Sequence, residues 1–139
     1  MLQNYSICII DDDEVYKFFM KRVLKIKKLA DDVMSFADGE EAYNFIYKNK
    51  ENPEKLPDLI FLDINMPIMD GFQFMDEYAK IQPEIDKKIP IFMITSSIDP
   101  IDLEHSKKYA EITDFIIKPV KADVLKRIIN SLNKSSKLS

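Results

Sequence analysis

Four short apolar runs, each of which stops at a polar residue, constrain the fold of this chain more than any other feature. Every position within a run is apolar, which is typical of a strand in a parallel sheet covered on both faces. A weaker fifth candidate, residues 33–37, is predicted to lie nearer an edge of the sheet. The four runs are Ile7-Cys8-Ile9-Ile10, Leu59-Ile60-Phe61-Leu62, Ile91-Phe92-Met93-Ile94 and Phe115-Ile116-Ile117.

Stretches with helical spacing separate these runs, so strands and helices are predicted to alternate along the chain. Five β–α units joined by right-handed crossovers predict an α/β fold, in which a doubly wound parallel sheet forms the middle of three layers. In the fourth helix, aspartate would cap the first turn and proline would occupy its first position. The predicted helices cover about residues 14–27, 39–49, 72–79, a stretch that begins at Asp99 and Pro100, and 124–132.

Length and charge restrict the class of protein further. The 139 residues fit one domain, predicted to span 1–139 with a core at about 5–132 and a polar C-terminal tail at 133–139. The net charge of −4 argues against nucleic acid as a direct partner, because phosphate contacts need clustered basic residues. No apolar run has the length of a membrane span and the N-terminus lacks signal-peptide features, so we expect a cytoplasmic protein without a membrane partner. Cys8 lies inside an apolar run and is predicted to be buried.

The polar residues at the ends of the runs define the candidate site. The carboxyl ends of parallel strands meet at one edge of the sheet, where ligands bind. Neighbouring carboxylates repel one another, and oxygen ligands without a Cys or His cluster favour Mg²⁺ or a similar ion such as Mn²⁺. A hydroxyl and a lysine at the same edge supply donors to an anion. The sequence therefore predicts a site for a metal and a phosphoryl group, formed by Asp11, Asp12, Asp63, Thr95 and Lys118.

Each of these residues has a simpler explanation when it is taken alone. An aspartate at a strand end often caps a helix, as Asp13 is predicted to do. Thr95 alone is consistent with a plain strand residue, and Lys118 alone with a solvated surface lysine. The specificity lies in the set, because four of the five strand ends carry the expected group.

Four segments in this order closely resemble the receiver domain of response regulators, over about residues 5–132. The segment that begins at Leu62 is highly specific. The resemblance implies the flavodoxin-like strand order 2-1-3-4-5 and a cis peptide bond between Lys118 and Pro119. The segments are Ile9-Ile10-Asp11-Asp12-Asp13, Leu62-Asp63-Ile64-Asn65-Met66-Pro67-Ile68-Met69-Asp70-Gly71, Ile94-Thr95-Ser96 and Phe115-Ile116-Ile117-Lys118-Pro119.

The resemblance also implies a role for each acidic residue. Asp63 would accept the phosphoryl group. Asp12 would ligate Mg²⁺ directly, and Asp11 would do so largely through water. Asn65 would offer its backbone carbonyl as a further ligand.

The remaining residues of the site would respond to the new phosphoryl group. Thr95 would hydrogen-bond to it and Lys118 would pair with it. Movement of Thr95 would let Phe115 turn inward, so these two residues are the expected switch. The surface that changes would be about residues 99–131.

By the same resemblance the chain is a stand-alone response regulator of two-component signal transduction and not an enzyme beyond Mg²⁺-dependent self-phosphorylation and slow autodephosphorylation. A histidine kinase or histidine phosphotransfer protein would donate the phosphoryl group. An unidentified output protein would bind the switched surface of a monomer or weak homodimer. One alternative, a phosphohydrolase resembling the haloacid dehalogenase group, needs an acid where this chain has Asn65. The other, a degenerate receiver used only for docking, is disfavoured by the complete set of site residues.

The first helical stretch carries more apolar residues than one helix face can bury. Tyr16, Phe18, Phe19 and Met20 are consecutive but for one lysine, so some of them must leave the core face. We interpret the exposed aromatic residues as a docking surface for the phosphoryl donor, slightly in preference to isolated surface residues. The apolar stripe at helical spacing consists of Val15, Phe18, Phe19, Val23 and Ile26.

The C-terminal half departs from the family pattern at two points. Residues 111–114 stand where many members have a Gly-Ala pair, which leaves the local turn before the fifth strand open. The switch aromatic is often tyrosine, whereas Phe115 has no hydroxyl. His105 lies in a charged helix and is predicted to be exposed to solvent without a ligand role.

Overall fold

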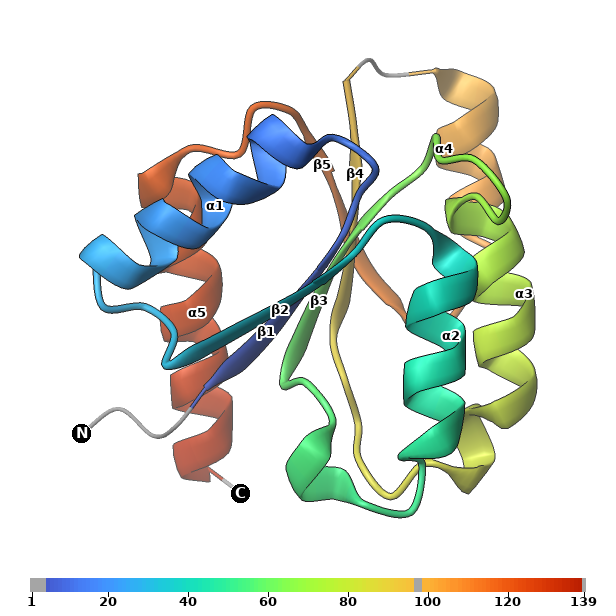
Figure 1. Cartoon of the computed structure of the whole chain (residues 1–139), viewed down its shortest axis with the longest axis horizontal. Helices are drawn as coiled ribbons and strands as arrows, with labels where there is room; N and C mark the ends of the chain where they lie inside the picture. The colour runs from blue at the N-terminus through green and yellow to red at the C-terminus, as the bar shows by residue number, and fades with distance from the viewer. Residues whose placement is uncertain (1–4, 97–98, 139) are drawn as a thin grey trace.

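The computed structural model describes residues 5–96 and 99–138, with side chains up to residue 132. Five parallel strands form one sheet in the order β2-β1-β3-β4-β5, which confirms the predicted fold (Figure 1). The described part of the chain contains no helix long and apolar enough to cross a membrane. The strands are β1 (Ser6–Ile10), β2 (Asp32–Phe36), β3 (Leu59–Asp63), β4 (Ile91–Thr95) and β5 (Ile112–Ile117).

Helices cover both faces of the sheet. Figure 1 shows α1 and α5 on one side, with α2, α3 and α4 on the other. Two cores result, because alternate residues of a strand point to opposite faces. In β1, Cys8 and Ile10 are buried towards α2 and α3, whereas Ile7 and Ile9 are buried towards α1 and α5. The helices are α1 (Glu14–Ile26), α2 (Gly39–Lys48), η1 (Pro53–Lys55), α3 (Gly71–Ile81), η2 (Gln82–Glu84), α4 (Pro100–Ser106) and α5 (Ala122–Leu138).

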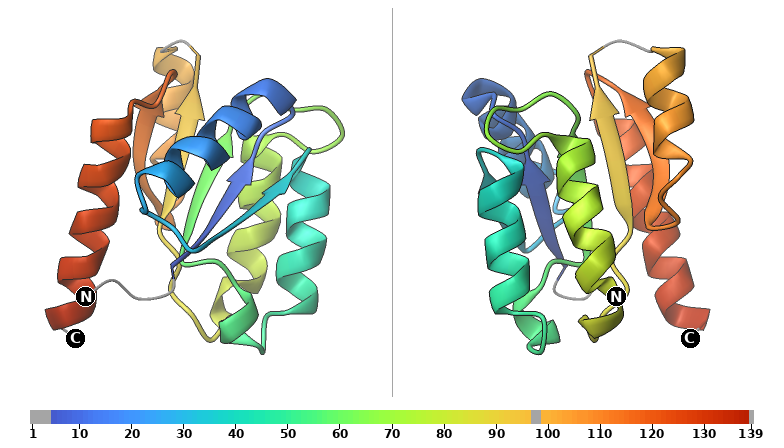
Figure 2. Two further views of the ribbon diagram at one scale, coloured as in Figure 1. Left: turned by 60° about the vertical axis from the view of Figure 1, so that its left-hand side comes forward. Right: turned by 90° about the vertical axis from the view of Figure 1, so that its right-hand side faces the viewer.

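The centre of the sheet differs from its edges. All residues of β3 and β4 are buried, as expected for continuous apolar runs covered on both faces. β2 lies at one edge, as predicted, and β5 at the other, and both are partly exposed. The strands all point to the same edge (Figure 2), so their carboxyl ends form one rim.

Aspartate side chains set the starts of four helices. The Asp13 carboxylate accepts a hydrogen bond from the Tyr16 amide, and Asp99 accepts one from the Ile101 amide, which confirms both predicted caps. Asp38 caps α2 in the same way. Asp70 forms a capping box with Gln73 at the start of α3. These caps fix where each helix leaves the rim.

The apolar stripe predicted for α1 is mostly not the face that packs on the sheet, and the expectation that some aromatic residues of this helix leave the core is confirmed. Val15 is 78% exposed and Phe18 61% exposed, and Phe19 and Ile26 also face solvent. The residues that α1 buries are Lys17, Met20 and Leu24, with Tyr16 and Val23 partly buried. The cap at Asp13 fixes the phase of the helix, and that phase places a lysine rather than the aromatic pair against the sheet.

Two boundaries also differ from the prediction. Residues 133–138 continue α5 and do not form a separate polar tail. No glycine or proline follows residue 132, so nothing in the sequence ends the helical hydrogen bonding there.

β5 begins at Ile112, three residues earlier than the apolar run indicates. Its register against β4 shifts at this point: Ile91 pairs with Ile112, but Phe92 pairs with Asp114. Thr113 is therefore an extra residue in a bulge. The segment that departs from the family pattern is thus the irregular start of an edge strand.

Candidate functional site

Three carboxylates gather at the rim formed by the carboxyl ends of the strands. Asp11 directly follows β1, Asp12 is the next residue, and Asp63 is the last residue of β3. One oxygen from each lies within 4.8 Å of the others. Asp11 is 1% exposed and Asp63 is 6% exposed, whereas Asp12 is exposed. The rim thus combines two buried carboxylates with one at the surface.

The local backbone holds the two buried carboxylates in place. The Asp13 amide donates to Oδ1 of Asp11 at 2.9 Å, so the residue that caps α1 also orients the acid before it. After β3 the chain returns, and the Gly71 amide donates to the Ile64 carbonyl at 2.8 Å. A Cβ at Gly71 would lie 2.6 Å from the Asp63 carbonyl oxygen, so only glycine fits this close approach.

Lys118 directly follows the edge strand β5, and its side chain reaches the acids along the rim. Its amide donates to the Thr95 carbonyl at 2.7 Å, which ties the end of β5 to the end of β4. Its Nζ lies 2.8 Å from Oδ2 of Asp11 and 3.6 Å from Oδ1 of Asp63. The Lys118–Pro119 peptide is cis, as the family resemblance implied. Thr95 is buried at the end of β4, so the structure brings all five rim residues to one edge.

The crowding of like charges changes how Asp63 ionises. Burial, and then the charge of Asp11, raise the pKa of the Asp63 carboxyl to about 6, although Lys118 acts in the opposite direction. Burial acts to lower the pKa of Lys118, but its hydrogen bond to Asp11 and the neighbouring carboxylates raise that pKa overall. The carboxylates at the site therefore outnumber the one ammonium that lies beside them in the described structure.

The donor set at the rim fits a hard divalent cation. Asp11, Asp12 and Asp63 offer carboxylate oxygens that converge, and one ammonium, on Lys118, cannot neutralise three carboxylates. Oxygen ligands of this kind are those that Mg²⁺ and Mn²⁺ prefer. Asn65 lies exposed in the connection between β3 and α3, two residues beyond Asp63.

Two other residues considered in the sequence analysis are Phe115, in β5, and His105, in α4. Phe115 is half-buried and packs against the core shared by α2 and α3. The prediction of a solvent-exposed His105 is wrong. Its ring stacks on Phe72 with 3.9 Å between centroids, and its Nε2 lies 3.3 Å from the Tyr109 hydroxyl. Phe72 lies in another helix, 33 residues earlier, so no local pattern could have indicated this contact.

Sequence reasoning missed Tyr16 as a residue of the site. It was counted among the apolar residues of α1, yet the Lys118 ammonium lies 4.5 Å from the centre of its ring. The available signal was its place in the first turn of a helix that starts beside the acids.

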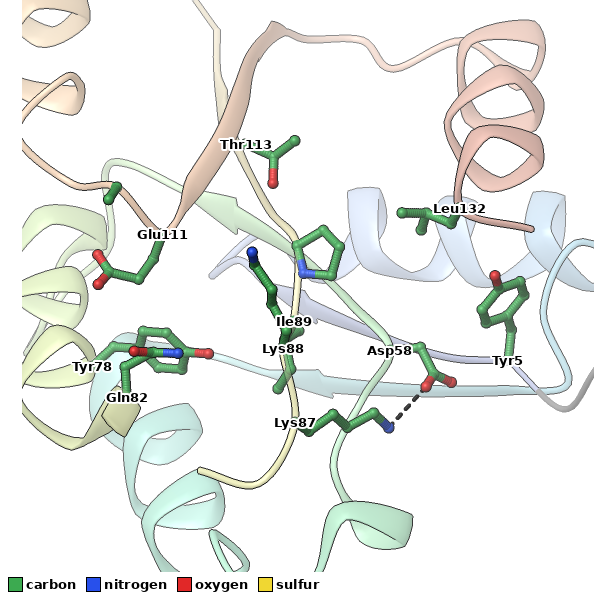
Figure 3. Close-up of a pocket in the computed structure, with 12 residues that line it drawn as sticks. Tyr5, Asp58, Tyr78, Gln82, Lys87, Lys88, Ile89, Glu111, Thr113 and Leu132 are labelled. Carbon is green, nitrogen blue, oxygen red and sulfur yellow. Dashed lines mark ion pairs between the residues drawn. The ribbon is translucent and has the colours of Figure 1, made fainter. Parts of the chain in front are cut away.

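A cavity of about 820 Å³ lies away from this rim (Figure 3). Its lining includes Asp58, Pro90 and Thr113, which precede or begin β3, β4 and β5 at their amino ends. Lys87 crosses it and pairs with Asp58 at 2.8 Å. The cavity is thus separate from the cluster of acids.

A doubly wound sheet that carries three carboxylates, a threonine and a lysine at its carboxyl edge has the architecture of a receiver domain of two-component signalling. The model of the response regulator receiver domain matches residues 7–130. The chain therefore belongs to this family of two-component signalling domains, which are not classical enzymes. Receiver domains bind Mg²⁺ at an acidic pocket and partner with histidine kinases or phosphotransfer proteins.

Individual relatives agree with this assignment. The chemotaxis protein CheY of Bacillus subtilis is 30% identical, with 94% of this chain and 97% of that protein covered. The probable transcriptional regulator ycf27 of Porphyridium aerugineum is 31% identical over 94% of this chain, but the match spans 49% of that protein. The sensor histidine kinase CheAY of Helicobacter pylori is 27% identical over 91% of this chain and 15% of its own length. The chain thus spans half or less of these two longer relatives.

Solved structures support the fold. A two-component response regulator from Cytophaga hutchinsonii superposes with a TM-score of 0.83 at 24% identity, covering 96% of this chain and 99% of that one. The receiver domain of a histidine kinase from Syntrophus aciditrophicus gives a TM-score of 0.77 at 29% identity, covering 97% and 94%.

Proposed function

We propose that this chain accepts a phosphoryl group onto Asp63 from a phosphohistidine of a kinase or phosphotransfer protein, in a step that depends on Mg²⁺ or Mn²⁺. The observation that carries the proposal is the convergence of Asp11, Asp12 and Asp63 around a site whose only nearby ammonium in the described structure is that of Lys118. Three carboxylates beside one ammonium leave an excess of negative charge, which a divalent cation would offset before an anionic phosphoryl group arrives.

The metal would be held by side-chain oxygens of Asp11, Asp12 and Asp63 and by the backbone carbonyl of Asn65. When bound, it supplies positive charge that offsets the carboxylates and the oxygens of the phosphoryl group. The raised pKa of Asp63 indicates that its ionised form, which is the nucleophile, is the form that needs this compensation.

The transfer itself requires little beyond orientation. An oxygen of Asp63 forms a bond to phosphorus while the bond between phosphorus and the donor histidine nitrogen breaks, and the electron pair stays on that nitrogen. Lys118, already 3.6 Å from Asp63, pairs with the acyl phosphate through a charge-assisted bond. Thr95, buried at the end of β4, donates a hydrogen bond from its hydroxyl to an oxygen of the same phosphoryl group.

Phosphorylation would then change the positions of residues at the end of β4 and in β5. A shift of Thr95 towards the phosphoryl group lets the half-buried Phe115 turn inward, and the surface of about residues 99–131 changes. An output protein would bind that surface, with the receiver a monomer or a weak homodimer in the cytoplasm. Residues 1–139 would form one receiver domain that acts through this separate partner.

The exposed apolar side of α1 is the proposed place for the donor. Val15, Phe18 and Phe19 face solvent on the helix whose start lies beside Asp11 and Asp12. A donor docked there would have its histidine near Asp63.

The test is to incubate the protein with acetyl phosphate and Mg²⁺ and to record its intact mass. The wild type should gain one phosphoryl group, and the gain should disappear without metal and in Asp63→Asn. Asp86→Asn, a change at an exposed aspartate after η2, should still gain it. A wild type that gains nothing, or an Asp63→Asn protein that gains as much, would refute the proposal.

A further inference from the structure

Tyr16 is built into the acidic site through the backbone of α1. Its amide donates to the capping carboxylate of Asp13 at 3.1 Å. The amide of Asp13 in turn donates to Asp11 at 2.9 Å. These two bonds fix the start of α1 relative to Asp11, and the Tyr16 ring therefore has a defined place beside the acids.

The face of the Tyr16 ring contacts the cation of the site. Nζ of Lys118 lies 4.5 Å from the ring centre, within the range of a cation–π interaction. The Lys118 side chain is only 19% exposed, and such interactions strengthen when the cation is shielded from water. Among the described residues, the ammonium lies 2.8 Å from Asp11, 3.6 Å from Asp63 and over the face of the ring.

The hydroxyl of Tyr16 does not account for its place. It is buried and makes no hydrogen bond to any group in the described part of the chain. A buried hydroxyl without a partner costs stability, so it is the aromatic face that this residue contributes to the site.

We propose that Tyr16 is a positioning residue whose ring keeps the Lys118 ammonium within reach of Asp63 and thereby raises the rate of phosphorylation. The inference rests on the proposed function. Lysine has a long side chain with many rotamers, and its shorter ion pair is with Asp11, not Asp63. Without the ring, the longer contact with Asp63 is the one contact among the described residues that draws the ammonium away from its closer partner, Asp11.

Replacing the ring separates this role from that of the hydroxyl. Tyr16→Met fills similar space with a flexible side chain, and Tyr16→Leu serves as a second variant without a ring. Phosphorylation by acetyl phosphate (labelling) should be about threefold to tenfold slower in Tyr16→Met and in Tyr16→Leu. This is the range expected from the loss of a partly shielded cation–π contact. Tyr16→Phe should label at nearly the wild-type rate. Equal slowing of Tyr16→Phe and Tyr16→Met would overturn the inference.

A double-mutant cycle tests whether Tyr16 acts through Lys118. In a Lys118→Met background, Tyr16→Met should cause no further slowing, because the cation that the ring holds is gone. Undiminished slowing in that background would show that Tyr16 acts by another route and would overturn the inference.

A second readout needs neither metal nor phosphodonor. The ε-methylene protons of Lys118 should show an upfield ring-current shift in NMR spectra of the wild type and Tyr16→Phe, and lose it in Tyr16→Met and Tyr16→Leu. An unchanged shift in the variants without a ring would overturn the contact. If acetyl phosphate phosphorylates Tyr16→Met as fast as the wild type, this inference alone is overturned. If the wild type itself is not phosphorylated, the proposed function is overturned as well.

Discussion

The two halves of the rim are built differently. On one side, Asp11 directly follows β1 and Asp63 ends β3, and both strands lie inside the sheet and are buried by helices on both faces. On the other side, β5 is an edge strand with a register shift and partly exposed residues. Interior strands hold side chains precisely, whereas edge segments with few buried contacts open at lower cost. The proposed phosphoacceptor Asp63 thus lies on the rigid half, whereas Phe115 of the proposed switch lies on the adaptable half.

The adaptable half depends on a few contacts between distant residues. α4 has 7 residues, too few for a helix to be stable without tertiary support. Its support includes the stacking of His105 on Phe72 and a hydrogen bond from the Tyr109 hydroxyl to Asp76, both across to α3. These contacts join α4 and the residues after it to α3, the helix that begins after the connection from Asp63.

The largest expected effect is on the rigid half, at Gly71. Gly71→Ala places a methyl group against the Asp63 backbone, where a Cβ would lie 2.6 Å from the carbonyl oxygen. We expect the free energy of unfolding to fall by about 1–3 kcal/mol, and labelling of Asp63 to fall with it. Urea unfolding and acetyl phosphate labelling measure the two effects. Lys80→Ala, an exposed change in the same helix, should alter neither, and a Gly71→Ala protein of wild-type stability would contradict the packing described for this side.

The second effect is a gain in stability that depends on pH. The raised pKa of Asp63, about 6 against an ordinary 3.8, means that ionised Asp63 destabilises the metal-free fold. The favourable contribution of the neutral acid is complete below about pH 4 and is lost as the pH rises through about 6. Asp63→Asn should therefore be more stable than the wild type by about 1–2 kcal/mol at pH 8, after allowance for solvent screening.

Thermal or urea unfolding of the metal-free proteins between pH 4 and pH 8 measures this difference. The two proteins should converge in stability towards pH 4. A difference that is constant with pH, or that grows as the pH falls, would show that charge crowding at Asp63 is not its cause.

The third effect separates the two halves. His105→Ala removes the ring that stacks on Phe72, which should cost about 0.5–1.5 kcal/mol. Amide hydrogen exchange should accelerate in α4 while the amides of β1 and β3 keep their protection, and acetyl phosphate labelling should stay near the wild-type rate. The control is Lys108→Ala, at an exposed position beyond α4. Equal acceleration in β1 and β3 would mean that the two halves open as one unit.

The smallest effect on stability is expected on the outer side of α1. Phe18→Ser and Phe19→Ser change exposed side chains, so the free energy of unfolding should stay within about 0.5 kcal/mol of the wild type. Transfer from a phosphorylated histidine donor should nevertheless slow, with acetyl phosphate labelling unchanged. Ile26→Ser, at the exposed far end of the same helix, is the matched control. Normal transfer to both phenylalanine variants would remove the docking proposal.

The sequence predicts the rigid half well because local patterns encode it. Continuous apolar runs identify β1, β3 and β4, and the aspartates that stop two of them lie where the carboxyl ends of parallel strands must meet. The capping aspartates Asp13 and Asp99 are equally local.

The adaptable half and the face of α1 are predicted less well because distant contacts decide them. His105 meets Phe72 across 33 residues, and no periodicity encodes that stack. Helical spacing grouped Val15 and Phe18 in one apolar stripe, but it did not indicate that the helix phase exposes them and buries Lys17 instead. Composition cannot supply a phase that is set by a cap and a neighbouring sheet.

The most direct test of the central claim is to identify the residue that carries the phosphoryl group. Borohydride reduces an acyl phosphate of aspartate to homoserine, so labelled protein can be reduced, digested and sequenced by mass spectrometry. The account predicts homoserine at position 63 alone, and only in samples that received both metal and phosphodonor. Homoserine at Asp11 or Asp12, or labelled protein without homoserine at 63, would contradict it.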